Sequence, residues 1–211
     1  MYVKLFMPKK TKDEAAQTRL SLLEAAKDEF YQNGIANTSI KQIVEKAGVT
    51  RGAFYWHFKN KEEVLNALLD QTIATYQEYF EGLIHKEMNS LDILETHAVN
   101  LFTTIYQDEK QKKSFAIFMQ TIGTEKNMPI FHAHSEQVYY NSLKFYEEQF
   151  EQARQDKLIS KANNPKVLAF AYNAYLTGVL DSWYASPKDI NLDISTYAKS
   201  LIELLLNPLK I

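Results

Sequence analysis

The residues whose chemistry is most suggestive lie between Ser39 and Lys61, in the sequence SIKQIVEKAGVTRGAFYWHFKNK. This stretch brings together Arg51, Tyr55 and Trp56 within two turns of a possible helix. An arginine can form a bidentate pair with a guanine, and exposed aromatic side chains are rarely without a partner surface. The combination favours a helix that enters a DNA major groove.

Two short helices joined by a tight turn are predicted to position these side chains. Ser39 is a favourable N-cap, and Gln42 can reach back to complete a capping box. Gly48 supplies the permissive backbone of a sharp helix-ending turn, and Thr50 can cap a second helix over residues 51–56. Two short helices joined by a turn that contains glycine form a helix-turn-helix pattern.

The second short helix is expected to have an inward and an outward face. Phe54 and Phe58 are four residues apart, so they share a face and are predicted to pack inward. Arg51, Tyr55 and Trp56 are then left outside. The alternatives are that both outward aromatics belong to the core and that the charged residues are ordinary solvated groups.

The charge distribution supports a polyanionic partner. The whole chain has a formal net charge of −2. Residues 1–61 nevertheless hold eleven Lys or Arg against six Asp or Glu, while the remainder holds thirteen against twenty. Such asymmetry indicates a basic nucleic-acid face on an otherwise acidic chain.

The sequence argues against catalysis and against a bound metal. There is no cysteine, which excludes disulfides and Cys-ligated metals. His132 and His134 are two apart, so a helix would point them to different faces, and no phosphate loop, nucleophile elbow or H-E-x-x-H motif occurs. We predict no metal, no cofactor and no enzymatic activity. The alternative hypothesis is an enzyme with a DNA-binding tail. A deep pocket that contains titratable groups with perturbed pKa values would favour this hypothesis.

We expect a cytoplasmic protein without a membrane partner. No apolar run reaches the ~18–20 residues that a membrane span requires, and the first residues are too few for the apolar region of a signal peptide. Met7 is a candidate alternative start. A basic arm would then follow, with Lys9, Lys10 and Lys12 adding electrostatic contacts to DNA.

Helical periodicity extends through nearly the whole chain, so we predict an all-α fold. A three-helix helix-turn-helix domain with its N-terminal arm is expected over residues 1–60, and a larger helical domain over residues 61–211. Ser90, Asn164 and Asp193 are the expected N-caps of later helices. Apart from the two short helices, the expected helical ranges are 12–33, 61–85, 90–107, 109–122, 130–157, 165–184 and 194–206.

Residues 19–65 resemble the N-terminal domain of TetR-family transcriptional repressors. The resemblance rests on short motifs at fixed spacings: Ala26, Phe30 and Gly34; Thr38-Ser39-Ile40; Ala47-Gly48-Val49; and Gly52-x-Phe54-Tyr55-Trp56-His57-Phe58, leading into Lys61. A weaker resemblance, over LTGVLDSWYASPKDINL at residues 176–192, is to the AcrR-like subgroup of multidrug-efflux repressors. Residues 83–166 carry no informative motif.

The resemblance implies that double-stranded operator DNA is the partner of the helix-turn-helix. Arg51 is implied to read a base, with a phosphate contact as the alternative, and Lys61 to bind a phosphate. The implied DNA-contacting residues are Thr38, Ser39, Thr50, Arg51, Gly52, Tyr55, Trp56, His57 and Lys61.

The resemblance also implies that the larger domain binds a small molecule. In AcrR-like proteins the matching helices surround a cavity for varied, largely apolar compounds. Asn173 and Thr177 share a helix face and could orient a ligand; alternatively they bond to the nearby backbone. By rough alignment the lining residues are expected to be Ile73, Phe80, Phe115, Met119, Asn173, Leu176 and Thr177.

The last two helices are expected to form a homodimer. Small residues line one helix and an apolar stripe runs along the other, and homologues pair these helices into a four-helix interface. The alternative is that both only complete the core of one protomer. The expected interface residues are Ala171, Ala174, Gly178, Ser182, Tyr197, Leu201 and Leu205.

Taken together, the sequence predicts a TetR-type repressor that binds a pseudo-palindromic operator as a homodimer. A small, largely apolar or amphipathic effector would release it, and its targets would be efflux-type genes. The alternative is a DNA-binding regulator relieved by a protein partner without a small-molecule ligand.

Overall fold

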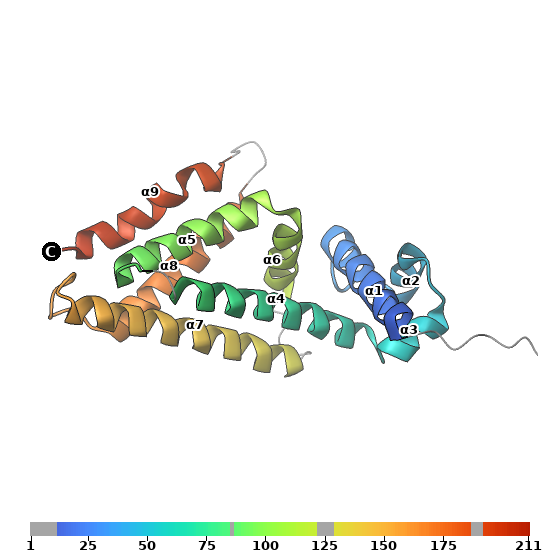
Figure 1. Cartoon of the computed structure of the whole chain (residues 1–211). Helices are drawn as coiled ribbons and strands as arrows, with labels where there is room; N and C mark the ends of the chain where they lie inside the picture. The colour runs from blue at the N-terminus through green and yellow to red at the C-terminus, as the bar shows by residue number, and fades with distance from the viewer. Residues whose placement is uncertain (1–11, 85–86, 122–128, 187–191) are drawn as a thin grey trace, which may run out of the picture. The chain divides into compact units, whose positions relative to one another are not determined.

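The computed structural model describes residues 12–84, 87–121, 129–186 and 192–211, and the regular elements of these residues are helices (Figure 1). A single antiparallel bridge, between Ile159 and Lys210, is the only extended pairing within them. The all-α prediction is confirmed. The helices are α1 (Lys12–Asn33), α2 (Ile40–Ala47), α3 (Arg51–His57), α4 (Lys61–Ile84), α5 (Ser90–Gln107), α6 (Glu109–Thr121), α7 (Pro129–Gln155), α8 (Pro165–Ala185) and α9 (Ile194–Leu206), followed by the 3-10 turn η2 (Asn207–Leu209).

The chain forms two compact units, which divide within α4 between Leu68 and Leu69. The sequence placed the domain boundary earlier, at the first residue of α4. The helix contributes buried leucines on both sides of the division: Leu65 and Leu68 near its start, and Leu83 near its end. Leu83 belongs to the hydrophobic core of the second unit.

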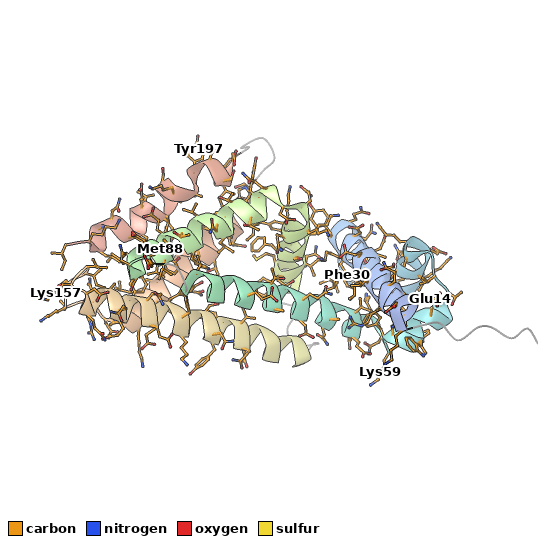
Figure 2. All side chains as sticks on the ribbon, in the orientation of Figure 1. Glu14, Phe30, Lys59, Met88, Lys157 and Tyr197 are labelled. Atoms are coloured by element: carbon orange, nitrogen blue, oxygen red, sulfur yellow. The ribbon has the colours of Figure 1, made fainter. Side chains whose placement is uncertain are left out.

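The first unit packs α1, α2 and α3 around a small apolar core. Phe30 of α1, Ile43 of α2 and Phe54 of α3 are fully buried, and Figure 2 labels Phe30 on α1. Gly34 follows α1 with a φ of 80°, a left-handed conformation that favours glycine. Helix α1 therefore ends where the sequence predicted.

Side chains at the helix termini supply most of the expected caps. Ser39 and Gln42 form the complete capping box before α2, and Gly48 ends that helix with a φ of 66°. Thr50 caps α3, where its hydroxyl accepts from the N–H of Ala53 at 3.1 Å. The predictions for Asn164 and Asp193 are also confirmed.

The prediction that Ser90 caps α5 is wrong. Asn89 is the N-cap, and its side-chain oxygen accepts from the N–H of Asp92 at 3.0 Å. Ser90 is the first residue of the helix and is buried. Two adjacent residues of good capping type cannot be separated by sequence, because either oxygen could reach the exposed N–H groups.

The second unit is built from α5 packed on α9 and α7 packed on α8, with α6 against α5. Its core contains one buried polar group of note, His97 of α5. The imidazole Nδ1 of His97 lies 3.0 Å from the hydroxyl of Tyr172 on α8, and that hydroxyl donates to the carbonyl of Leu94 at 2.7 Å. His97 is therefore a buried core residue with a polar partner for its ring nitrogen.

Within the described ranges, no helix combines the length and the apolar character needed to cross a membrane. The same residues hold no cluster of His, Asp and Glu side chains able to bind a metal ion. His132 and His134 lie outside the residues whose side chains are described.

Candidate nucleic-acid interface

Helix α3 presents the predicted outward face. Phe54 and Phe58 are buried in the first unit, whereas 47% of Tyr55 and 72% of Trp56 is exposed. Arg51 is also exposed, and His57 is half-buried. The alternative that Tyr55 and Trp56 fill the core is excluded for this unit.

The guanidinium of Arg51 is held over the ring of Tyr55, one helical turn away. Its Nη2 donates to the Tyr55 hydroxyl at 3.2 Å, and its Cζ lies 5.6 Å from the centre of the ring. The Tyr55 ring in turn packs edge-on against Phe54, with 5.5 Å between ring centres. The buried ring of Phe54 therefore packs against Tyr55. Tyr55 in turn holds the guanidinium of Arg51, the group best suited to bind a base. This preorganisation reduces the entropic cost of ordering the arginine on DNA.

Trp56 and His57 form a second aromatic pair on α3. Their rings meet edge-to-face with 4.5 Å between centres. Trp56 remains the most exposed aromatic side chain of the helix. The indole thus presents an apolar surface beside the Arg51–Tyr55 pair.

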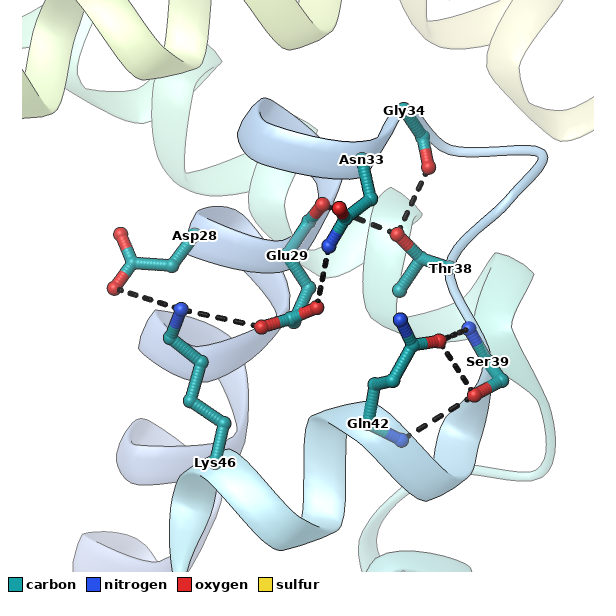
Figure 3. Close-up of polar contacts among 8 residues, drawn as sticks. All are labelled: Asp28, Glu29, Asn33, Gly34, Thr38, Ser39, Gln42 and Lys46. Carbon is teal, nitrogen blue, oxygen red and sulfur yellow. Dashed lines mark hydrogen bonds and ion pairs between the residues drawn. The ribbon is translucent and has the colours of Figure 1, made fainter.

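Thr38 does not lie on this surface. Only 2% of the residue is exposed, and its hydroxyl donates to the carbonyls of Gly34 at 2.8 Å and Glu29 at 3.1 Å (Figure 3). These carbonyls lie in the last turns of α1 and directly after it. The Thr38 side chain thus joins α1 to the start of α2, and a contact between this residue and DNA stays a prediction.

A polar cluster that sequence reasoning missed joins α1 to α2. The carboxylate of Glu29 accepts from Lys46 at 3.2 Å and from the Asn33 amide at 2.7 Å, and Lys46 also pairs with Asp28 at 3.9 Å (Figure 3). Asn33 and Glu29 share a helix face by their spacing. The partner Lys46 is seventeen residues away, so no local pattern could have shown it.

The remaining predicted residues divide between exposed and partly covered positions. Ser39, Thr50 and Gly52 are exposed, and the hydroxyls of the first two are engaged as N-caps. Lys61 is partly covered, and its ammonium donates to three backbone carbonyls of the loop between α1 and α2. Burial lowers the pKa of Lys61 from its ordinary value.

Comparison with known proteins agrees with this arrangement. Residues 22–68 match the family described as bacterial regulatory proteins of the tetR family. Residues 89–211, more than half of the chain, match the C-terminal region of MAATS-type transcriptional repressors. The chain belongs to the TetR family.

The relatives of this TetR-family chain differ in how much of it they match. AcrR of Shigella flexneri is 24% identical over 209 residues, which cover 95% of this chain and 94% of AcrR. TtgR of Pseudomonas putida is 51% identical over 70 residues, or 33% of either protein. ArpR of Pseudomonas putida is 37% identical over 108 residues, so the match spans about half of that protein.

Solved TetR-family structures share the fold over nearly the whole chain. NalD, described as the secondary repressor of the MexAB-OprM multidrug efflux pump in Pseudomonas aeruginosa, superposes with a TM-score of 0.80 at 26% identity, covering 94% of this chain and 98% of NalD. The SmeT–triclosan complex gives 0.78 at 25% identity and covers 92% of each chain.

In the second unit of this TetR-family chain, the residues predicted to line an effector site are variously placed. Leu176 is buried in the core, and Asn173, Phe115 and Met119 are half-buried. Thr177 is exposed, and its hydroxyl donates to the carbonyls of Asn173 at 2.9 Å and Ala174 at 3.2 Å. Thr177 thus bonds to the nearby backbone, as the alternative in the sequence analysis stated. The side chains of Ile73 and Phe80 lie outside the described residues.

A groove of about 940 Å³ lies on the second unit, and it is lined by residues other than these. It runs along the C-terminal half of α7 to the start of α8. Charged and amide side chains line most of it, including Lys144, Glu151 and Lys166. None of the residues predicted to bind an effector contributes to this groove.

Most of the residues predicted for a TetR-family dimer interface lie on outer faces of α8 and α9, but Leu201 and Leu205 are half-buried and pack against the core of the second unit. Ala171, Ala174, Gly178 and Ser182 are all exposed, and Tyr197 projects outward from α9 in Figure 2. Sequence reasoning missed large apolar side chains on the same helices: 62% of Val167, 60% of Phe170 and 71% of Leu204 is exposed. The available signal was helical spacing: Val167 and Phe170 lie four residues before Ala171 and Ala174 on α8, and Leu204 lies three residues after Leu201 on α9.

Proposed function

We propose that this chain is a repressor that binds a pseudo-palindromic operator as a homodimer and is released by a small, largely apolar or amphipathic effector. The observation that carries the proposal is the outward face of α3, where Arg51 is held by Tyr55 over a buried phenylalanine. A basic, aromatic and preorganised helix face is suited to the major groove. Its proposed site of action, the chromosome, places the protein in the cytoplasm.

In this proposal the residues of the helix-turn-helix that were predicted to contact DNA have distinct roles. Arg51 donates to a guanine in each half-site, and Tyr55 orients Arg51. Trp56 and His57 contact the sugar-phosphate backbone or thymine methyl groups, while the exposed backbone around Ser39, Thr50 and Gly52 approaches phosphates. The side chain of Thr38 takes no direct part, because it is buried.

The homodimer is proposed to form through the exposed apolar faces of α8 and α9. Large apolar patches on a protein surface mark interaction sites, and the small residues of α8 allow two helices to approach closely. A two-fold dimer would present its two α3 helices about one DNA turn apart, roughly 34–36 Å. This spacing requires a pseudo-palindromic operator.

We expect Ala174→Arg to dissociate the dimer while leaving each protomer folded. Ala174 is exposed in the protomer, so the arginine has room there, but an uncompensated charge buried in an interface costs about 3–5 kcal/mol. The dimer dissociation constant from sedimentation equilibrium should rise at least about a hundredfold. Ala162→Arg, on the exposed turn before α8, is the matched control. An unchanged dissociation constant for Ala174→Arg would place the interface elsewhere.

The effector is proposed to bind among the half-buried apolar side chains of α6 and α8, including Phe115 and Met119. The reported complex of SmeT with triclosan supports a small, apolar ligand class, and the names of NalD and SmeT support efflux-type target genes. Thr177 stands outside this proposal because it is exposed and bonded to its own helix.

A thermal-shift screen against apolar cations, dyes and bile-like amphiphiles tests the effector. A binding compound should raise the unfolding temperature and lower operator affinity, because it can only shift the equilibrium by its differential affinity for the two states. If no compound of these classes does either, relief by a protein partner becomes the better account.

A further inference from the structure

Arg19 of α1 is a cationic residue of the first unit that has no role in the proposed function. It lies three, four and seven residues before Leu22, Leu23 and Ala26, which belong to the buried side of α1. Its aliphatic stem therefore starts from the core-facing side of the helix. The residue is nevertheless exposed, and its Cζ lies 5.0 Å from the centre of the Phe58 ring. Arg19 thus brings a positive charge from α1 to the C-terminal end of α3.

The charge of Arg19 is not neutralised by a neighbouring carboxylate. Among the described residues, no Asp or Glu side chain lies within ion-pair distance of its guanidinium, which stacks on Phe58 instead. Arg154 of the second unit shows the other arrangement, since it pairs with Glu151 at 2.6 Å. A guanidinium has five N–H donors at its edges, and stacking on a ring face leaves them available to an acceptor outside the protein.

Phe58 connects Arg19 to the aromatic residues of α3. The ring centres of His57 and Phe58 lie 6.3 Å apart, and those of Trp56 and His57 lie 4.5 Å apart. Lys59, which follows Phe58, is exposed. A continuous series of rings therefore runs from Arg19 to Trp56, which is proposed to contact the sugar-phosphate backbone or thymine methyl groups.

The position of Arg19 beside α3 limits which part of a DNA duplex it can reach. The first residues of a recognition helix contact base edges, and Arg51 is the first residue of α3. The seven residues of α3 form a helix about 10 Å long, whereas the major groove is about 12 Å wide. A group beside the C-terminal end of α3 therefore lies at the wall of the groove, which consists of phosphates and sugars.

We propose that Arg19 binds a DNA phosphate at the edge of the major groove, as an additional contact from α1. The planar fork of a guanidinium matches the oxygens of a phosphate. The Phe58 ring holds this fork in place before DNA binds, which lowers the entropic cost of the contact. The inference rests on the proposed function, because it requires α3 to lie in the major groove.

The salt dependence of binding to a random-sequence duplex tests this contact. A phosphate contact forms on any sequence, and each one contributes about 0.9 to the slope of log K against log salt. Arg19→Gln in the full chain should lower the magnitude of the slope by about 0.9 per protomer. Arg154→Gln is the matched control, because it removes the same charge from an ion pair of the second unit and should leave the slope unchanged. An unchanged slope in Arg19→Gln would overturn the proposal.

A second variant separates a phosphate contact from a purely structural role of the stack on Phe58. Arg19→Lys keeps the charge and loses the planar fork, so it should retain the wild-type slope and bind DNA more weakly than the wild type. Urea unfolding of both Arg19 variants measures the contribution of the stack to stability. If Arg19→Gln lowers the free energy of unfolding and leaves the slope unchanged, Arg19 only joins α1 to α3 and the proposal is wrong.

Single neutral methylphosphonate groups, placed in turn along a duplex from the region upstream of the gene, locate the contacted phosphate. At one position in each half-site, the replacement should weaken binding of the wild type and leave binding of Arg19→Gln unaffected. If the wild type does not prefer this duplex to random DNA, the operator claim fails, while the slope on random DNA still reports on Arg19. If the wild type prefers the duplex and every replacement affects both proteins equally, the role of Arg19 alone is contradicted.

Discussion

Replacing Arg51 with alanine is expected to remove most of the sequence-specific DNA binding. Arg51 is exposed, so the variant should fold as the wild type does. A bidentate arginine–guanine pair contributes about 1–3 kcal/mol of discrimination at each half-site, and a dimer has two half-sites. Fluorescence anisotropy should show operator affinity falling towards the affinity for random DNA, with the latter much less changed.

Two further variants test whether Arg51 acts through its contact with Tyr55 and not only through its charge. Tyr55→Phe keeps the ring under the guanidinium and removes the hydroxyl that accepts from Nη2; it should weaken operator binding by about 0.5–1.5 kcal/mol, the net contribution of one hydrogen bond. Lys144→Ala removes a positive charge from an exposed ion pair of the second unit and should leave binding unchanged. Equal effects of Arg51→Ala on operator and random DNA would instead assign Arg51 to a phosphate.

Replacing Tyr172 with phenylalanine is expected to destabilise the second unit by about 1–3 kcal/mol, the cost of a buried polar group without its partner. The Tyr172 hydroxyl has one hydrogen, which it donates to the carbonyl of Leu94. The contact with His97 must therefore run from Nδ1–H of the imidazole to the tyrosine oxygen. Urea unfolding measures the loss. Tyr140→Phe, at an exposed tyrosine, is the control and should change the free energy of unfolding by less than about 0.5 kcal/mol.

The same network makes stability depend on pH. Burial lowers the pKa of His97 from 6.5 to about 3. Between these values the unfolded chain binds a proton that the folded chain excludes, so this contribution to stability is complete above pH 6.5 and is lost as the pH falls. The free energy of unfolding should decrease by about 1.4 kcal/mol per pH unit in that window. His97→Gln should flatten this slope; an equal slope in the variant would assign it to other groups.

Local sequence signals were sufficient for most of the fold. Helix termini depend on interactions between residues that are close in sequence. Spacing alone therefore located them at the glycine after α1, the capping box at Ser39 and the proline at the start of α8. The inward pair Phe54 and Phe58 likewise determined which face of α3 is exposed. The choice between Asn89 and Ser90 failed, because both could serve as a cap.

Contacts between distant residues account for what the sequence did not show. The hydroxyl of Thr38 reaches Glu29, and Lys61 reaches Ile35 twenty-six residues away, so both side chains turn inward where motif position implied DNA. His97 and Tyr172 are seventy-five residues apart. Such pairs are determined by helix packing, which a single sequence does not encode in any local pattern.

The central claim is that α3 reads a specific DNA sequence, and a competition titration tests it most directly. A labelled duplex from the region upstream of the gene is bound by the full chain at one fixed salt concentration. Unlabelled copies of that duplex and of a shuffled sequence then compete for the protein. The account predicts that the shuffled competitor requires at least about a thousandfold higher concentration. Displacement at the same concentration by both duplexes would contradict it.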